Sequence, residues 1–321
     1  MANQLLLSTQ TRAAAGRRDL PAIAGLFNQC EAVDRLDSST TLEDLQRRLD
    51  HPPPGGTQHR QLWHTPSGQL IGVASVWVDE PTEALEAWLG VKIHPDYRGQ
   101  GLEAELLTWC EQLVQAQAAQ VPAQLRAGVR EDKPYYRAMY EAQGYQVVRW
   151  FNDMVRPLAE PIPAPQFPAG FTSRPTNAAE IQAWVEMFNQ SFVDHWNFSP
   201  MTLADRQHHL SYPTYQPALD WVAVAADGTL VAFCEGDILH DDNARKGHKE
   251  GWIGLLGTRR GYRRLGLARA MLLQGLHQLR AAGMETALLG VDSENPNQAK
   301  SLYEATGFRV KKTYLSYEKR L

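Results

Sequence analysis

Arginine and glycine crowd a turn in the segment GWIGLLGTRRGYRRLGLARA, which starts at Gly251. Arg263, Gly266 and Ala268 form the pattern R-x-x-G-x-A, with small residues where a backbone must come close to a ligand. Amide groups at the start of a helix lack intrahelical partners and attract anions, and a pyrophosphate suits them. The turn therefore predicts an anion site. Taken alone, so short a pattern also fits an ordinary solvated loop.

Apolar residues on either side of the turn predict the elements that position it. Ile253, Leu255 and Leu256 form a short run typical of a central strand. Apolar side chains then recur at helical spacing: Leu267, Ala270, Met271, Leu273, Leu276 and Leu279. Gly283 is expected to end this helix, and a second apolar strand is expected at 286–291.

The motif N-P-x-x-A-x-x-L-Y-E-x-x-G-F follows that strand, beginning at Asn295. The order of strand, arginine-rich turn, helix, strand and this motif resembles the GNAT superfamily of acyl-CoA-dependent N-acyltransferases. The same order occurs earlier, in a copy displaced by about 165 residues. Three pairs of residues match: Arg98 with Arg263, Gly101 with Gly266, and Tyr140 with Tyr303. An internal duplication is the simplest explanation.

The resemblance covers nearly the whole chain, twice, and the tandem arrangement is similar to that of mycothiol synthase-like two-domain members. It implies an α/β (α+β) fold with two tandem GNAT-like domains, each a mixed, splayed, largely antiparallel sheet flanked by helices. We expect an N-terminal domain at residues 1–157, a proline-rich linker at 158–169 and a C-terminal domain at 170–321.

The resemblance also implies a co-substrate, acetyl-CoA, whose pantetheine arm lies where the fourth and fifth strands of this fold splay apart. The fourth strand would end at Leu256, Gly257 and Thr258, whose backbone would bond the acyl and pantetheine amides. The pyrophosphate would be held by the turn and helix start, which are Arg263, Arg264, Leu265, Gly266, Leu267, Ala268 and Arg269. Asn295 and Asn297 bracket the position of a cofactor-contacting asparagine.

Tyr303 matches the family's tyrosine that protonates the departing thiolate. A phenol with a pKa of about 10 stays protonated at neutral pH and can give up its proton as the thiolate forms. Packing of its helix is the alternative role. Glu250 is the first candidate for the base, because steps of two from Thr258 along a strand reach it on the same face. Glu235 and Asp237 on the preceding strand are alternatives.

The acceptor side is expected at an aromatic loop, 194–201, with the sequence DHWNFSPM. His195 and Trp196 in this loop, together with Glu235, are the predicted substrate contacts. His195 is also a possible second base, and a packed histidine is the alternative. Loop sequence does not identify the acceptor.

The first copy departs from the family pattern. Glu103 stands where the last small residue of the turn belongs, and a carboxylate at a helix start competes with phosphate. The following tyrosine helix has the sequence KPYYR from Lys133 and lacks the N-x-x-A run. We therefore expect the C-terminal domain to be catalytic. The first domain would keep acyl-CoA binding or form a wall of the substrate cleft.

Composition is that of an ordinary soluble protein, with 43% hydrophobic and 21% charged residues among 321. The net charge of −4 argues against a nucleic-acid binder. The three cysteines, Cys30, Cys110 and Cys234, form no CxxC pair, and no metal is proposed. We expect a cytoplasmic protein, because no segment has the length of a signal or membrane-spanning stretch.

The sequence thus favours an N-acetyltransferase that moves acetyl from acetyl-CoA to a primary amine of a small molecule, by direct attack in a ternary complex. A non-catalytic acyl-CoA-binding or sensing protein is one alternative, and a protein N-terminal or lysine acetyltransferase is another. Both a monomer with a pseudo-dimeric domain arrangement and a homodimer fit the duplication.

Overall fold

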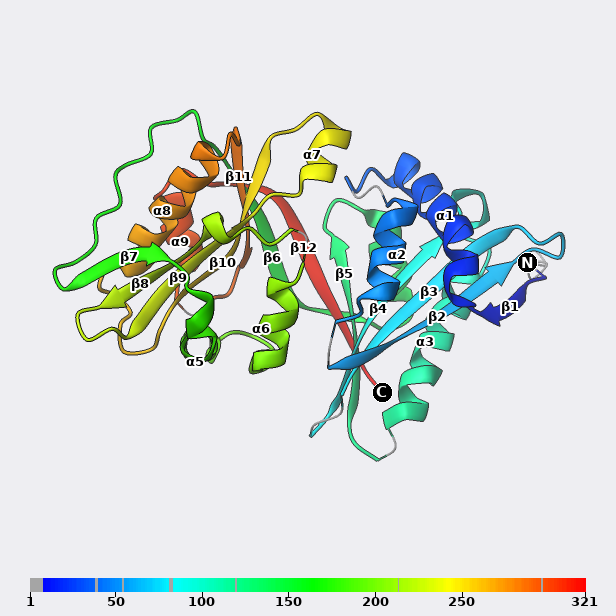
Figure 1. Cartoon of the computed structure of the whole chain (residues 1–321). Helices are drawn as coiled ribbons and strands as arrows, with labels where there is room; N and C mark the ends of the chain where they lie inside the picture. The colour runs from blue at the N-terminus through cyan, green and yellow to red at the C-terminus, as the bar shows by residue number, and fades with distance from the viewer. Residues whose placement is uncertain are drawn as a thin grey trace. The chain divides into compact units, whose positions relative to one another are not determined.

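The computed structural model describes residues 8–37, 40–53, 55–80, 83–118, 120–212, 214–295 and 297–321 (Figure 1). The chain divides into two compact units. The first unit runs to Arg149 and takes up Tyr314–Leu321 as well, and the second unit is Trp150–Thr313.

The first unit is a six-stranded sheet with helices on its faces. Its elements are β1 (Gln10–Ala13), α1 (Leu20–Asp34), α2 (Leu42–Asp50), β2 (Gly56–His64), β3 (Leu70–Asp79), β4 (Leu85–Ile93), α3 (Leu102–Ala118), β5 (Ala123–Arg130), α4 (Pro134–Ala142) and most of β12 (Arg309–Arg320). The strand order is β1-β2-β3-β4-β5-β12. Neighbours are antiparallel except β4 and β5, which are parallel.

The second unit repeats this plan. Its elements are most of β6 (Gln146–Pro157), β7 (Phe171–Pro175), α5 (Ile181–Phe192), α6 (Leu203–Leu210), β8 (Asp220–Ala225), β9 (Leu230–Asp237), α7 (His240–Lys246), β10 (Glu250–Thr258), α8 (Leu267–Ala281), β11 (Thr286–Asp292) and α9 (Ala299–Glu304). The order is β6-β11-β10-β9-β8-β7, and β10 and β11 form the parallel pair.

Helices cover both faces of the second sheet because alternate strand residues point to opposite sides. Phe233 of β9 belongs to the apolar cluster around Trp184 of α5. Cys234, the next residue, belongs to the cluster around Leu276 of α8. The backbone of α8 comes so close to β9 that a Cβ on Gly275 would lie 2.5 Å from the sulfur of Cys234. Close packing therefore fixes α8, and with it the turn that precedes it.

Strands β6 and β12 each cross from one unit to the other. Residues 151–157 of β6 pair with β11, and residues 314–320 of β12 pair with β5. The units therefore differ from the consecutive domains expected at 1–157 and 170–321. Within the expected linker, 158–169, Leu158 and Ile162 are buried in the core of the second unit. Pairing between strands so distant in sequence leaves no local sequence signal.

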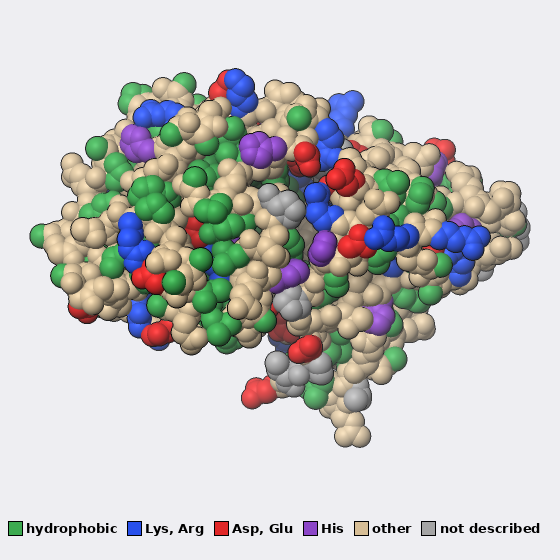
Figure 2. Space-filling view, in the orientation of Figure 1, with side chains coloured by type: hydrophobic (Ala, Val, Ile, Leu, Met, Phe, Trp, Pro, Cys, Tyr) green, Lys and Arg blue, Asp and Glu red, His purple; other side chains and the backbone are tan. Residues whose placement is uncertain are grey.

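Basic and acidic side chains alternate on the face drawn in Figure 2, without one extended basic area. Among the described helices, none combines the length and the apolarity needed to cross a membrane. The described residues also contain no group of three or more His, Cys, Asp or Glu side chains placed to hold a metal ion.

Candidate active site

The second sheet splits between β10 and β11. The two strands pair only from Glu250 with Thr286 to Ile253 with Leu289. A bulge then interrupts the pairing of β10 with β9 between Ile253 and Leu255. Glycine at the bulge leaves room for Asp237, because a Cβ on Gly254 would lie 2.2 Å from a carboxylate oxygen of that residue. Past this point β10 runs on without β11, and a cavity of about 600 Å³ occupies the split.

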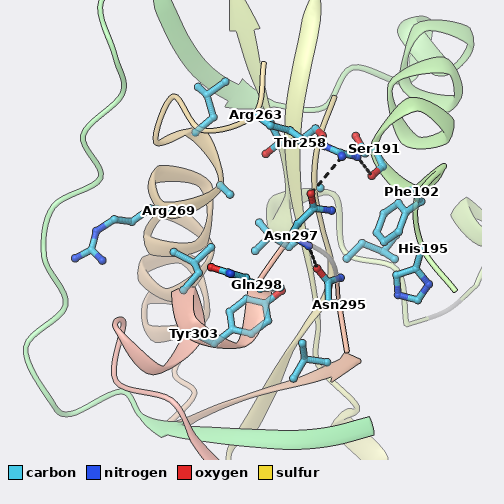
Figure 3. A pocket seen from close by; sticks show the side chains of 18 of the residues that line it. Ser191, Phe192, His195, Thr258, Arg263, Arg269, Asn295, Asn297, Gln298 and Tyr303 are labelled. Carbon is cyan, nitrogen blue, oxygen red and sulfur yellow. Dashed lines mark hydrogen bonds between the residues drawn. The ribbon is translucent and has the colours of Figure 1, made fainter. Parts of the chain in front are cut away.

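The cavity brings together most of the residues predicted to bind cofactor (Figure 3). Those that line it are Leu256, Gly257, Thr258, Arg263, Arg264, Gly266, Leu267, Ala268, Arg269, Asn295 and Asn297. Leu265 does not line it and is 48% exposed. Tyr303 and His195 also line the cavity, whereas Glu250, Glu235 and Trp196 do not.

The turn before α8 offers backbone amides to an anion. Gly266 begins the helix with φ of 89°, and no side chain caps the helix start. Such a φ favours glycine, and Arg264 also has a positive φ, of 64°. The first backbone N–H groups of α8 are therefore free to donate to a bound anion, at the positive end of the helix dipole.

Arg263 braces the turn with its side chain. Its guanidinium donates to Asp194 at 2.7 Å, to the carbonyl of Ser191 at 2.9 Å and to Asn297 at 3.3 Å. These bonds tie the turn to the end of α5 and to the loop before α9, as the dashed lines of Figure 3 show in part. The family resemblance implied that Arg263 lies at the pyrophosphate, whereas its guanidinium is paired with Asp194. In Figure 3 Arg269 points away from Tyr303.

Tyr303 lies on α9 and is 8% exposed. Its ring packs edge-on to Phe308, with 6.1 Å between the ring centres. Burial, with a smaller effect from the nearby Cys234, raises the pKa of Tyr303 to about 12. The phenol therefore stays protonated at neutral pH, as a proton donor must.

Two of the three carboxylates considered as bases are already paired. Glu250 lies 3.1 Å from the ammonium of Lys311, at the end of β10 where the strands are still joined. Glu235 is fully buried and accepts from Arg206 at 2.6 Å and from His209. Although burial acts to raise the pKa of Glu235, His209 and Arg206 together lower it.

Asp237 is the third of these carboxylates, and it faces the bulge at Gly254. It forms no hydrogen bond or ion pair with the residues that the structure describes. Burial raises the pKa of Asp237, and the negative charges of Glu235 and Asp220 raise it further. Asp237 does not itself line the cavity, but Gly254 beside it does, and an unpaired carboxyl group so placed can accept a proton through a water molecule.

The aromatic loop contributes one residue to the cavity. His195 lies there with its Nδ1 3.0 Å from the carbonyl of Trp196, and its ring lies 5.6 Å from that of Phe192. Trp196 instead packs on Phe151, at 5.8 Å between ring centres.

In the first unit the equivalent turn, before α3, is bonded by the side chain of Glu103 at the start of that helix. Arg98 pairs with Asp34 at 2.7 Å, as Arg263 pairs with Asp194. Glu103, however, accepts from the backbone N–H of Gly99 at 2.7 Å and from the hydroxyl of Tyr135 at 3.0 Å. Its carboxylate thus takes a backbone donor that an incoming phosphate would need.

Comparison with known proteins agrees with this geometry. A family model described as the acetyltransferase (GNAT) family matches residues 21–145 and again 181–308. A mycothiol acetyltransferase of Salinispora tropica is 29% identical over 302 residues, covering 94% of this chain and 92% of that protein.

Two solved structures share the tandem fold. A GCN5-related N-acetyltransferase from Sphaerobacter thermophilus is 26% identical, with a TM-score of 0.75 over 100% of this chain and 96% of that one. A tandem GNAT protein from the clavulanic acid biosynthesis pathway is 14% identical, with a TM-score of 0.76 over 98% of both chains. The predicted α/β fold with two GNAT-like domains is confirmed. Because the model matches most of the chain in two copies, this protein belongs to the acetyltransferase (GNAT) family.

Proposed function

We propose that the second unit transfers acetyl from acetyl-CoA to a primary amine of a small molecule. The observation that carries this proposal is the split between β10 and β11, which leads from Tyr303 to the uncapped start of α8. The first unit lacks an open cradle of this kind, because Glu103 binds the turn. The catalytic unit is accordingly the second one.

The cavity suits acetyl-CoA along its length. Past Ile253, one edge of β10 pairs with no strand in the described part of the chain, so the backbone at Leu256 to Thr258 can bond the amides of the pantetheine arm. A Cβ on Gly257 would lie 2.5 Å from the ring of Phe233, so the strand is bare at this position. The pyrophosphate would then meet the amides from Arg264 to Arg269.

The reaction is direct attack of the amine nitrogen on the thioester carbonyl, which forms an amide and breaks the carbon–sulfur bond. Asp237 takes the proton that the attacking amine loses, directly or through a water molecule, and later passes it to solvent. Tyr303 donates its hydroxyl proton to the departing sulfur and recovers one from solvent. The products are the acetylated amine and CoA thiol, so protons balance.

The surroundings of Asp237 favour a cationic acceptor. Burial is the main cause of the raised pKa of Asp237, and the charges of Glu235 and Asp220 add to it although Arg206 and His209 pair with them. A protonated amine is attracted to the ionised carboxylate of Asp237, loses its first proton to solvent, and then attacks as the neutral amine. The relatives named mycothiol acetyltransferase support a small-molecule acceptor, and a thiol-sugar amine is one specific candidate.

Two matched glycine variants test the proposal by calorimetry and by assay of thiol release. Gly266→Glu and Gly101→Glu place the same side chain on glycines with φ of 89° and 93°. Both substitutions therefore impose similar strain. We expect one equivalent of acetyl-CoA to bind wild type and Gly101→Glu, and none to bind Gly266→Glu, which also loses turnover. If Gly101→Glu lost acetyl-CoA binding and turnover while Gly266→Glu kept them, the chemistry would belong to the first unit and the proposal would be rejected.

A further inference from the structure

The first unit has a cavity of its own, of about 290 Å³, where β4 and β5 part. These strands pair only from Leu85 with Ala123 to Trp88 with Arg126. Gly90 and Gly128 line the cavity beyond that point, and a Cβ on either would meet no atom within 4 Å. The space above the sheet is therefore open at both glycines.

Three cations that pair with no carboxylate among the described residues line this cavity: Arg48, Arg60 and Lys92. Among the described residues, Lys92 has only the ring of Tyr136, 5.2 Å away, and Arg60 has only the hydroxyl of Ser75, at 3.1 Å. Burial lowers the pKa of Lys92, and burial together with the charge of Arg48 lowers that of Arg60. Lys92 and Arg60 thus lose hydration without gaining an anion, whereas Arg48 is exposed at the rim.

Nearby charged groups do not remove this excess of positive charge. Asp34 is the carboxylate that faces Lys92 from α1, but it already accepts from Arg98 at 2.7 Å and from the hydroxyl of Tyr136 at 2.6 Å. The charge of Glu31 also acts on Lys92, less strongly than that of Asp34, and the charge of Arg98 opposes both carboxylates. Arg130 also lines the cavity, paired with Asp132 at 2.6 Å.

Comparison of the two splits indicates what kind of ligand fits. The offset of 165 residues that aligns Arg98 with Arg263 also aligns Lys92 with Gly257. The first unit therefore has an ammonium group at the position where the second unit has a glycine without a side chain. Glu103 closes the helix start. A small cavity with partly buried cations and no pyrophosphate cradle suits a small anion rather than acyl-CoA.

We propose that the first unit binds a small organic anion, carrying a carboxylate or phosphate group, between Arg48, Arg60 and Lys92. The ligand's negative charge replaces the missing carboxylate partners. Its binding is separate from acetyl transfer, because the cavity lies wholly within the first unit.

The test is thermal unfolding in sodium phosphate and in sodium succinate, each against sodium chloride of equal ionic strength. At anion concentrations well above Kd we expect the wild-type melting temperature to rise by about 3 °C. Lys92→Met and Arg60→Gln should each lose this shift, and Arg18→Gln, which removes an exposed cation outside the cavity, should keep it. Lys92→Met should also melt above wild type without added anion, because it removes a partly buried charge.

Phosphate can also meet the start of α8, so Gly266→Glu is included. A shift that survives Gly266→Glu and disappears in Lys92→Met belongs to the first unit. A response to phosphate alone identifies a phosphate ester as the ligand class, and a response to succinate alone identifies a carboxylate. No shift beyond that in chloride, or an unchanged shift in both Lys92→Met and Arg60→Gln, would overturn the proposal whatever the fate of acetyl transfer.

Discussion

Arg263 and Asp194 form an ion pair of 2.7 Å that joins the turn before α8 to the chain just after α5. Arg98 and Asp34 form the same pair in the first unit, also at 2.7 Å. Both arginines bond the carbonyl five residues earlier as well, Arg263 at 3.4 Å and Arg98 at 3.1 Å. The arginine of the R-x-x-G motif is thus a brace in both copies, and the backbone of the turn is left to hold phosphate.

Arg263→Gln should therefore weaken acetyl-CoA binding by loosening the turn, without removing a direct phosphate contact. We expect KM for acetyl-CoA to rise on the order of tenfold, which corresponds to the loss of one well-placed interaction. The maximal rate should change little, because Tyr303 and Asp237 are untouched. Initial-rate kinetics of thiol release measure both quantities.

Arg98→Gln is the matched control for that variant. Its pair with Asp34 is largely buried, so its loss should lower the free energy of unfolding by about 3 kcal/mol. The KM for acetyl-CoA should nevertheless stay near the wild-type value. A large rise of KM in Arg98→Gln, with Arg263→Gln unaffected, would show that the cofactor occupies the first unit instead.

Tyr303→Phe should lower kcat by about 100-fold, the usual range for loss of a positioned proton donor. The ring is kept, so packing against Phe308 and the calorimetric affinity for acetyl-CoA should remain. Tyr140→Phe alters the aligned tyrosine of the first copy and should leave kcat unchanged. A Tyr303→Phe enzyme with full turnover would remove the tyrosine from the reaction and leave it as a packing residue.

Asp237→Asn should abolish the acid limb of the pH profile of kcat/KM, together with most of the activity. Because burial raises the pKa of Asp237, the wild-type limb should lie above the ordinary pKa of an aspartate. The raised pKa also means that ionising Asp237 costs stability in the folded state. Asp237→Asn should accordingly gain about 1 kcal/mol of unfolding free energy at pH 7, within the range of stabilising substitutions.

Glu250→Gln separates the two candidate bases. The carboxylate of Glu250 is paired with Lys311. Glu250→Gln should therefore change the free energy of unfolding and leave the acid limb of the kcat/KM profile in place. If the acid limb instead disappears in Glu250→Gln and persists in Asp237→Asn, Glu250 is the base.

The periodicity of apolar residues and the two glycine-rich turns were enough to predict the strands and helices around the second cavity. The resemblance to the GNAT family implied most of the residues that line this cavity, because its motifs cover two of the segments that form it, the end of β10 with the turn before α8 and the loop before α9. Contacts between distant segments were not accessible in this way. The Arg263–Asp194 pair, the burial of Glu235 behind Arg206 and the crossing of β6 and β12 all depend on packing. Glu250 was expected on the same face of β10 as Thr258 because the two are an even number of residues apart. The bulge at Gly254 shifts the strand register between them, so this alternation does not hold.

The buried cluster around Glu235 predicts a dependence of stability on pH. His209 forms a hydrogen bond with Glu235, and this bond raises the pKa of His209 above the value of about 6.5 usual for the unfolded chain. The folded state therefore binds a proton more tightly there. This contribution to stability is complete below about pH 6.5 and is lost as pH rises through the folded-state pKa of His209.

His209→Gln should remove that dependence. Melting temperatures measured from pH 5.5 to 9 should fall less steeply for His209→Gln than for wild type, because the imidazolium is no longer lost. The adjacent His208→Gln is the control, since His208 contacts the hydroxyl of Tyr212 at 2.9 Å and has no carboxylate partner among the described residues. If both variants follow the wild-type slope, the pairing of His209 with Glu235 does not contribute to stability.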